Sequence, residues 1–369
     1  MTHSHTTPDV AVVGGGLAGL ASAWRAAQRG AGVVLLERGE LAAQASHAAA
    51  GMLAPAAEAD LGERALLALG LRAAERWPAF AAELEDVTGM RVGYLRCGTL
   101  MVARDGDEAA ALEREQGFRA RLGVQLTRLR PSQARRLEPA LAPTLRLALE
   151  APGDHAADPR LLAPALAEAA RRAGAVVRTG AEVAEVRLGE VRLTGGEVVR
   201  AGDVVVAAGA WAGALAGVPV RPVKGQILRL RDPEGPGLLE RVVRWEGGYL
   251  VPRGTGRYVL GATMEDRGFD TTVTAGAVHE LLRDASELVP GVQELELEEA
   301  LAGLRPATPD NTPLIGRSER TGLVFATGHH RNGVLLASIT GDLVADALAG
   351  AEPEDALHPD RFAVREVVA

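Results

Sequence analysis

The chain has 369 residues, enough for two domains of about 100–200 residues each. Hydrophobic residues make up 47% and charged residues 24%, the balance of a globular protein with a buried core. The net charge of −8 argues against nucleic acid or an anionic membrane as the main partner.

Cysteine and hydropathy patterns suggest the compartment. Cys97 is the only cysteine, so an intrachain disulfide is impossible and a reducing compartment such as the cytoplasm is expected. We expect no secretory signal and no membrane-spanning segment, because no apolar run is long enough. His3 and His5 fit a frayed polar terminus better than a metal site, and no metal is expected.

The first elements form a β-α-β unit. "DVAVV" (residues 9–13) predicts a strand, apolar residues then recur at helical spacing, and "AGVVLLE" predicts a second buried strand closed by Glu37. Gly14, Gly16 and Gly19 form GxGxxG between the first strand and the helix. Such glycines allow a tight turn, backbone approach to a pyrophosphate and close helix packing, and an acid about 20 residues further on accepts hydrogen bonds from ribose. The unit therefore predicts dinucleotide binding; the alternative is a glycine-rich turn without a ligand.

The next segment, "LAAQASHAAAGMLAPAAEAD" (41–60), is made almost entirely of small residues. Such a run can approach a bulky ligand closely, although an alanine-rich helix without a ligand is the alternative. A long helix is predicted over 61–85, a strand over 94–105, and a charged helix after it. A further helix begins at Pro159, with Asp158 as N-cap and Gly174 at its end.

The second half is rich in β-strands. Strands with tight turns are predicted over 175–211 and 220–273, then a helix over 278–288, a strand, a turn-rich loop over 302–316, a strand over 322–328 and a last helix after it. In "GDVVVAAGAWAG" (202–213) a hydrophobic strand runs directly into Ala-Gly-Ala-Trp, which favours FAD over NAD; an ordinary buried strand and turn is the alternative. The β-rich blocks interrupt the α/β elements, so both domains are expected to be discontinuous. One comprises residues 1–88, 150–220 and 303–369, and the other comprises 89–149 and 221–302.

Seven segments together carry a resemblance to a known family. "VVGGGLAGL", "SHAAAGML", "VVVAAGAW", "VKGQ", "GYLVPR", "AGLRPATPD" and "GHHRNGVLL" occur in this order. The chain resembles the D-amino-acid oxidase/sarcosine oxidase superfamily of FAD enzymes over nearly its whole length, and most closely its glycine oxidase (ThiO) branch. The resemblance implies an α/β fold: a Rossmann-like FAD-binding domain of the two-dinucleotide-binding-domain type, and a second α+β substrate domain built on an antiparallel sheet.

The resemblance also implies the cofactor site. FAD is expected to be non-covalent, because Cys97 lies far from the tethering cysteine of some relatives and His47 is one residue out of register with the tethering histidine of others. The positions expected to contact FAD or shape its site are Gly14, Gly16, Leu17, Ala18, Gly19, Glu37, Arg38, Ala45, Ser46, Ala50, Gly51, Met52, Val183, Gly209, His329, His330, Arg331, Asn332, Gly333, Val334 and Leu335.

Three residues are expected at the substrate: Tyr249, Arg305 and Arg331. An amino acid oxidase must bind a carboxylate, and the planar guanidinium fork pairs with it bidentately. Arg305 is predicted to follow a strand and begin a turn, Arg331 to lie between a strand and a helix, and the Tyr249 hydroxyl to donate a third hydrogen bond. The alternative for each arginine is a surface salt bridge or a carbonyl clamp. No catalytic base is expected, because an amine arriving as the free base can give hydride directly from Cα.

The implied reaction is oxidative deamination of glycine, sarcosine or D-alanine by oxygen to the imine or 2-oxo acid, ammonia and hydrogen peroxide. The glycine imine would supply the thiazole of thiamine, so thiazole-forming enzymes are expected partners. Two alternatives stay open: a D-amino acid dehydrogenase that passes electrons to a carrier, and a flavin-bound non-catalytic module. The sequence leaves open whether the protein is a monomer or a homo-oligomer.

Overall fold

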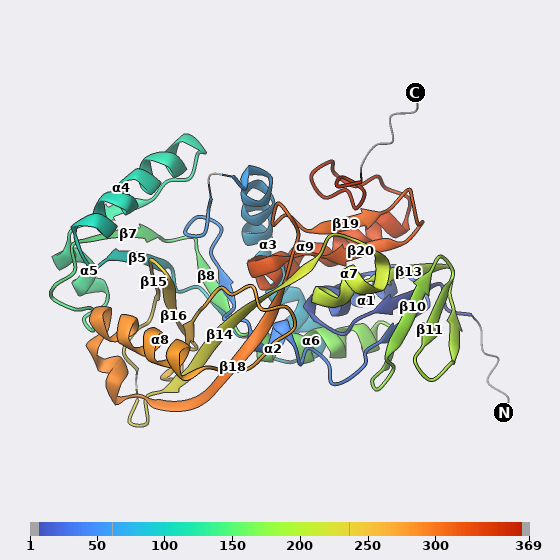
Figure 1. Cartoon of the computed structure of the whole chain (residues 1–369), viewed down its shortest axis with the longest axis horizontal. Helices are drawn as coiled ribbons and strands as arrows, with labels where there is room; N and C mark the ends of the chain where they lie inside the picture. Colours follow the sequence, from blue (N-terminus) through green and yellow to red (C-terminus); the bar gives the residue numbers. More distant parts are fainter. Residues whose placement is uncertain (1–6, 61, 236, 364–369) are drawn as a thin grey trace.

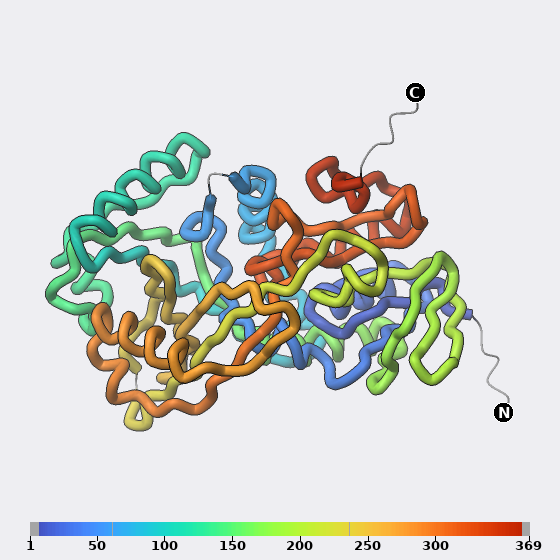
Figure 2. The backbone as a smooth tube through the Cα atoms, in the orientation of Figure 1, coloured from blue at the N-terminus to red at the C-terminus, as the bar shows by residue number. Residues whose placement is uncertain are grey.

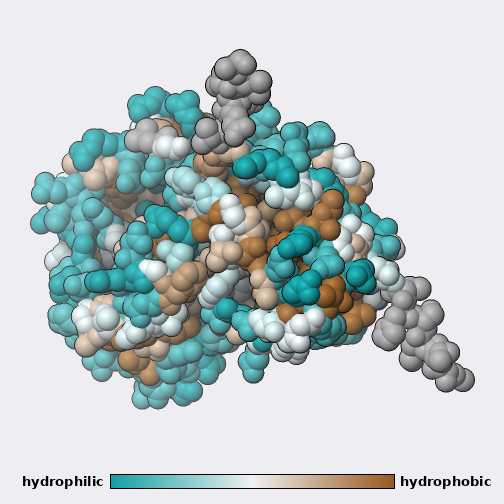
Figure 3. Space-filling view, turned by 45° about the vertical axis from the view of Figure 1, so that its right-hand side comes forward, coloured by the Kyte–Doolittle hydropathy of each residue, from teal (hydrophilic) through white to brown (hydrophobic). Residues whose placement is uncertain are grey.

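A computed structural model describes residues 7–60, 62–235 and 237–363, so His3 and His5 lie outside the described residues. Two large β-sheets lie toward opposite ends of the elongated molecule, and two long strands, β14 and β18, extend from one sheet toward the other (Figure 1). The tube view follows the chain crossing between the two halves several times (Figure 2). Hydrophobic side chains gather in the middle and on the right of the face in Figure 3, while hydrophilic side chains cover most of the left.

The first sheet has six strands in the order β19-β20-β13-β1-β2-β9. All neighbours are parallel except β19, which pairs antiparallel with β20 at one edge. Alternate residues of β1 point to opposite faces: Val10 and Val12 pack with the helices, whereas Ala11 and Val13 pack with the small sheet β10-β11-β12. Burial on both faces explains the unbroken apolar runs of these strands. The bounds are β1 Val10–Val13, β2 Val33–Leu36, β9 Val176–Arg178, β10 Val183–Arg187, β11 Glu190–Leu193, β12 Val198–Arg200, β13 Asp203–Val206, β19 Leu314–Arg317 and β20 Val324–Thr327.

Four helices cover one face of this sheet: α1 Leu17–Gln28, α3 Arg64–Thr88, α6 Pro159–Arg172 and α9 Gly333–Leu348. The predicted cap of α6 is confirmed, because the Asp158 carboxylate accepts a hydrogen bond from the Arg160 N–H at 3.0 Å. The indole of Trp77 on α3 donates to the Leu335 carbonyl of α9 at 2.8 Å.

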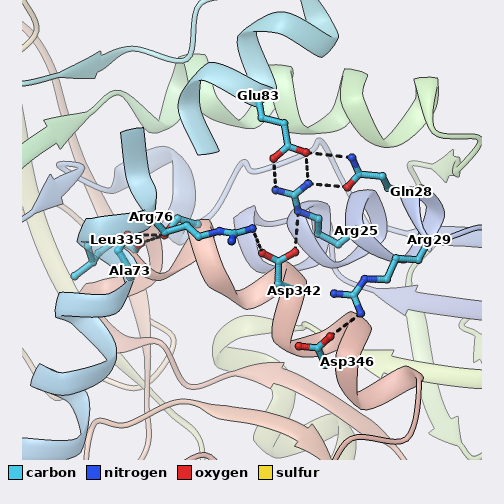
Figure 4. A network of polar contacts seen from close by, with 10 residues as sticks. Arg25, Gln28, Arg29, Ala73, Arg76, Glu83, Leu335, Asp342 and Asp346 are labelled. Atoms are coloured by element: carbon cyan, nitrogen blue, oxygen red, sulfur yellow. Dashed lines mark hydrogen bonds and ion pairs between the residues drawn. The ribbon is translucent and has the colours of Figure 1, made fainter. Parts of the chain in front are cut away.

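A charged network joins α1, α3 and α9 (Figure 4). The guanidinium of Arg25, only 5% exposed, donates to both carboxylate oxygens of Glu83 at 2.5 and 2.7 Å and lies 3.1 Å from Asp342. Arg29 makes a single pair with Asp346 at 2.6 Å, and both of these side chains are half exposed. Arg25 thus fixes three helices relative to one another, and with them the N-terminus of α9.

The second sheet has eight strands in the order β18-β14-β17-β16-β15-β5-β7-β6. It is antiparallel except for the β15–β5 pair. Helix α8 packs on one face of it through Leu281, Ala285 and Leu288. The bounds are β5 Thr99–Ala103, β6 Thr127–Leu129, β7 Leu147–Ala151, β14 Arg221–Arg231, β15 Val242–Trp245, β16 Gly248–Pro252, β17 Arg257–Gly261, β18 Glu296–Ala307, α4 Gly106–Arg121, α5 Pro131–Leu137 and α8 Ala275–Leu288. The α/β fold with a second, antiparallel-sheet half is confirmed.

Short elements connect the two halves. A three-stranded sheet, β3-β8-β4, joins Met52–Leu53, His155–Ala157 and Tyr94–Leu95, and α2 (Ala45–Ala48) and α7 (Ala212–Ala216) are brief. Three single-turn helices are Gly209–Trp211, Pro290–Glu294 and His330–Asn332. The small-residue stretch over 41–60 therefore forms only one helical turn and one short strand, not the alternative alanine-rich helix.

The turn-rich loop predicted over 302–316 is wrong at both ends, because its last residues, from Leu314, belong to strand β19 and its first residues belong to β18. Residues Ala302 to Ala307 continue β18, and Arg305 lies opposite Val223 of β14 instead of beginning a turn. The Pro306 that suggested a turn is tolerated because β18 is an edge strand, where a missing N–H donor breaks no ladder. A domain boundary between residues 302 and 303 would cut this strand. The five-segment division of the chain stays a prediction.

Candidate functional site

A cavity of about 1030 Å³ lies where the two halves meet. Ligand sites commonly have volumes of about 300–1,000 Å³, so this one is large enough for a dinucleotide and a small substrate together. Its wall includes the first turn of α1, the segment from Ala45 to Met52, strands β14, β15, β16 and β18, helix α8, and the link between β20 and α9. These are the regions in which most of the predicted site residues lie.

The dinucleotide end of the cavity is built on the glycine turn. A Cβ on Gly14 would lie 2.4 Å from the Ala207 carbonyl oxygen, and one on Gly19 would lie 1.9 Å from the Gly14 carbonyl oxygen, so neither position admits a side chain. Helix α1 has no side-chain cap and no acidic residue in its first turn. Apart from the N–H of Leu17, which donates to the Ser46 hydroxyl, no side chain occupies its first N–H groups, as a pyrophosphate requires.

Glu37 closes this turn. Its carboxylate accepts hydrogen bonds from the N–H of Gly15 at 2.7 Å and of Gly39 at 3.0 Å. The Leu17 N–H donates to the Ser46 hydroxyl at 3.2 Å, which joins α1 to the small-residue segment. The closed glycine turn, the uncapped helix and the adjacent carboxylate fit FAD.

Most predicted cofactor positions line the cavity. They are Gly16, Leu17, Ala18, Ala45, Ser46, Ala50, Gly51, Met52, Gly209, His329, His330, Arg331, Gly333 and Val334. The predicted positions outside its wall are Gly14, Gly19, Glu37, Arg38, Val183, Asn332 and Leu335.

The positions outside the wall have other surroundings. Arg38 stacks on Trp211, its guanidinium 3.9 Å from the ring centre. Val183 packs beside the core between the large and small sheets. Asn332 and Leu335 are buried beside a second, much smaller cavity next to α3.

Tyr249 on β16 and Arg305 on β18 line the cavity from two strands of the second sheet that β14 and β17 separate in the strand order. The Arg305 guanidinium donates through Nη1 to the Thr263 carbonyl at 3.1 Å and to the Lys224 carbonyl at 3.3 Å. Burial raises the pKa of the Tyr249 phenol, against an opposing effect of Arg305. The phenol is therefore a neutral donor beside a fixed cation, a pair suited to a carboxylate.

Arg331 also lines the cavity, but it has an acidic partner that the sequence did not suggest. Its guanidinium forms an ion pair with Glu63, with Nη1 3.2 Å from Oε1, and donates to the Glu58 carbonyl at 3.3 Å. The negative charge of Glu63 partly neutralises Arg331, so Arg331 attracts a substrate carboxylate less strongly.

The two histidines of the β20–α9 link are buried and neutral. Burial lowers the pKa of His329 to about 4 and, together with Arg331, lowers the pKa of His330 to about 3. The His329 ring contacts the Thr340 hydroxyl at 3.0 Å. The His330 backbone has a φ of 46°, a left-handed conformation uncommon outside glycine, which marks a locally constrained turn.

A family model described as FAD dependent oxidoreductase matches residues 9–347. The chain belongs to this family. Among relatives of this FAD-dependent oxidoreductase, "Glycine oxidase" of Geobacillus kaustophilus is 39% identical, with 97% of each chain covered. The crystal structure of glycine oxidase from that organism superposes with a TM-score of 0.88 at 38% identity, covering 94% of this chain and 96% of the other. The "Bifunctional protein ThiO/ThiG" of Trichormus variabilis is 36% identical over 96% of this chain, which spans only 55% of that longer protein.

No helix within the described residues of the FAD-dependent oxidoreductase combines the length and apolarity needed to cross a membrane. The predicted family, fold class and cofactor are confirmed. The individual site residues remain predictions, because the comparisons measure the similarity of whole chains and not the role of single residues.

The sequence analysis missed the following charged cavity residues: Glu58, Asp60, Glu115, Arg119, Arg244, Glu265, Glu280 and Asp284. Burial raises the pKa of Glu58, while Arg331, Arg244 and Arg305 act against this rise. Arg119, 2% exposed, donates to the carbonyls of Ala56 and Ala57 at 2.8 and 3.0 Å. Only Arg244 left a signal in the sequence: it is a charge within the otherwise apolar run "VVRW" of a buried strand.

Proposed function

We propose that this FAD-dependent oxidoreductase is a glycine oxidase. Glycine, oxygen and water would give glyoxylate, ammonia and hydrogen peroxide, and other small amines such as sarcosine and D-alanine would react in the same way. The proposal is supported by the glycine oxidase of Geobacillus kaustophilus, which is similar over nearly the entire length of both chains. The observation that carries it is the pairing of a fixed guanidinium, Arg305, with the neutral phenol of Tyr249 in one cavity wall.

Arg305 and Tyr249 would bind the substrate carboxylate and so orient Cα. The two carbonyl contacts of Arg305 use Nη1, which leaves Nη2 and Nε for a carboxylate. Tyr249, neutral at physiological pH, would donate the third hydrogen bond. Bound FAD would supply the two-electron acceptor, in a site made by the glycine turn and the small-residue segment.

Other residues shape the site without transferring a proton. His329 and His330 are neutral and buried, so they would exclude water and position backbone groups. The N-terminus of α9 at Gly333 lines the cavity and brings the positive end of the helix dipole to it. We propose that Arg331, paired with Glu63, contributes mainly to this positive field and secondarily to carboxylate binding.

Coupling to thiazole formation is part of the proposal. Its support is the ThiO/ThiG protein of Trichormus variabilis, whose name joins two activities in one polypeptide. The glycine imine would be passed on before water hydrolyses it, most simply in the cytoplasm and with a thiazole-forming enzyme as partner. Transfer of electrons to a carrier instead of oxygen is the competing activity.

Anaerobic reduction of the flavin tests the proposed site. The purified protein should be yellow, acid should release intact FAD, and glycine should bleach the flavin absorbance without oxygen. Methylamine, which lacks the carboxylate, should bleach it far more slowly. Equal rates with both amines would contradict the carboxylate site, and a colourless protein that fails to bind FAD would contradict the whole proposal.

A further inference from the structure

The arginines of the cavity wall differ in their partners. Arg331 is paired with Glu63, and Arg119 with Glu115 at 2.9 Å and two carbonyls. Arg305 donates to two carbonyls. Arg244 has no hydrogen bond and no carboxylate within 4.0 Å among the described residues of the chain. Arg244 is half-buried in the cavity wall, and a guanidinium that loses part of its water without gaining a counter-anion is destabilised.

Arg244 is placed for a substrate contact. It lies on β15 directly opposite Tyr249 in the antiparallel β15–β16 pair. Cross-strand neighbours have Cβ atoms about 4.5–5.5 Å apart and point to the same face. The flanking residue Val243 belongs to the core on the other face, and Trp245 belongs to that core and also borders the cavity, which Arg244 lines together with Tyr249.

Glu58 is a cavity acid whose ionisation Arg244 affects. Both line the cavity, and Arg244 acts on the pKa of Glu58, but their charged groups are more than 4.0 Å apart. Glu58 also feels Arg305 and Arg331. Three guanidinium groups therefore act on this one carboxyl. The cavity wall also carries Asp60, Glu115, Glu265, Glu280 and Asp284, but none of their carboxylates lies within 4.0 Å of the Arg244 guanidinium.

We propose that Arg244 binds a second carboxylate of the substrate, so that amino acids with two carboxylates are a preferred substrate class. This inference rests on the proposed function, in which Arg305 and Tyr249 take the first carboxylate. The second group is attached either to the amine nitrogen or to Cα. For N-(carboxymethyl)glycine, one molecule each of the diacid, oxygen and water gives glyoxylate, glycine and hydrogen peroxide. The Cα–N bond breaks by hydrolysis after loss of two electrons and two protons to oxygen.

Steady-state kinetics of the FAD-loaded enzyme test the inference with two matched substrate pairs. N-(carboxymethyl)glycine is compared with sarcosine, and D-aspartate with D-asparagine, with glycine measured alongside. The pair with the larger diacid preference identifies where the second carboxylate is attached. Arg244→Met removes the charge at similar length, and Arg244→Lys keeps a charge without the fork. Arg187→Met, on an exposed strand outside the cavity wall, is the control.

In the wild type, kcat/KM for at least one diacid should equal or exceed that of its neutral counterpart. Arg244→Met should lower this diacid-to-neutral ratio about 10- to 100-fold, with glycine and sarcosine changed by less than about twofold. The diacid-to-neutral ratio of Arg244→Lys should lie between the ratios of the wild type and of Arg244→Met. The ratio of Arg187→Met should match that of the wild type.

Three results would overturn the inference while leaving glycine oxidation intact. The first is a wild type that oxidises glycine and strongly rejects both diacids. The second is an equal loss on every substrate in Arg244→Met, which would assign Arg244 to the first carboxylate or to structure. The third is full recovery of kcat/KM for every substrate in the Arg244→Met/Glu58→Gln double variant, which would make Arg244 only a counter-ion for Glu58. If the enzyme oxidises none of the amines, glycine included, the proposed function itself is contradicted.

Discussion

Adding a single methyl group at Gly225 should disable the carboxylate site without unfolding the protein. Gly225 lies on β14, and its backbone is not in the left-handed region, so alanine fits the strand. A Cβ there would lie 2.2 Å from Nη1, 2.3 Å from Nη2 and 2.4 Å from Cζ of Arg305, whereas ordinary van der Waals contact begins at 3.4 Å. The guanidinium must therefore move by about 1 Å, which breaks its contacts with the Lys224 and Thr263 carbonyls.

The expected effect follows from this displacement. A misplacement of about 1 Å at a positioning group can lower a rate by about 100-fold, so kcat/KM for glycine should fall about 10- to 100-fold in Gly225→Ala. The group that moves is the end of a flexible side chain, so the free energy of unfolding should change by about 1 kcal/mol or less. FAD content and the thermal unfolding midpoint should stay close to those of the wild type.

Oxygen consumption at varied glycine concentrations measures this effect, with differential scanning fluorimetry as the stability readout. Gly117→Ala is the matched control: it adds the same methyl group in the exposed part of α4, where no atom lies within 4 Å, and should leave the kinetics unchanged. If Gly225→Ala keeps the wild-type kcat/KM, Arg305 does not bind the substrate carboxylate. A loss of the same size with methylamine would also contradict the reasoning.

Three further variants test the site and the fold. Arg305→Ala should cost about 1.5–3 kcal/mol of glycine binding, roughly 10- to 100-fold in KM, and Arg305→Lys should recover only part of it; an unchanged KM in Arg305→Ala would refute the carboxylate role. Arg25→Met should lower the free energy of unfolding by about 1.5–3 kcal/mol in urea titrations, because Glu83 and Asp342 both lose a buried partner, whereas Arg29→Met should cost at most about 1 kcal/mol. Burial lowers the pKa of His329 to about 4, so its contribution to stability is complete above the unfolded value of about 6.5 and is lost as the pH falls toward 4. The loss is on the order of 3 kcal/mol, and His329→Gln should flatten the stability profile between pH 6.5 and 4; a profile as steep as that of the wild type would contradict this.

The N-terminal unit could be predicted because its signals are local. The glycines of the turn, the helix that follows and Glu37 all lie within one β-α-β unit, and each has a geometric reason for its residue type. Even here the sequence could not show that Glu37 binds the N–H groups of Gly15 and Gly39. Both contacts depend on the three-dimensional path of the turn.

The substrate side was harder because its residues meet through long-range pairing. Arg305 was assigned to a turn on the strength of neighbouring prolines, yet pairing with β14 continues the strand through them. Glu63, the partner of Arg331, is 268 residues away along the chain, and no periodicity links the two. Arg244 and Glu58 became candidates only when the cavity brought them together.

The central claim, oxygen-dependent oxidation of glycine, is tested most directly by product stoichiometry. The yellow, FAD-loaded protein is incubated with glycine in air, and hydrogen peroxide, glyoxylate and ammonia are measured together in the absence of any other electron acceptor. We predict that the three products accumulate in equal amounts and that each molecule of peroxide accounts for one molecule of oxygen consumed. A protein that binds FAD but releases no peroxide with glycine, and forms glyoxylate only when an artificial electron acceptor is added, would contradict the claim and identify a dehydrogenase.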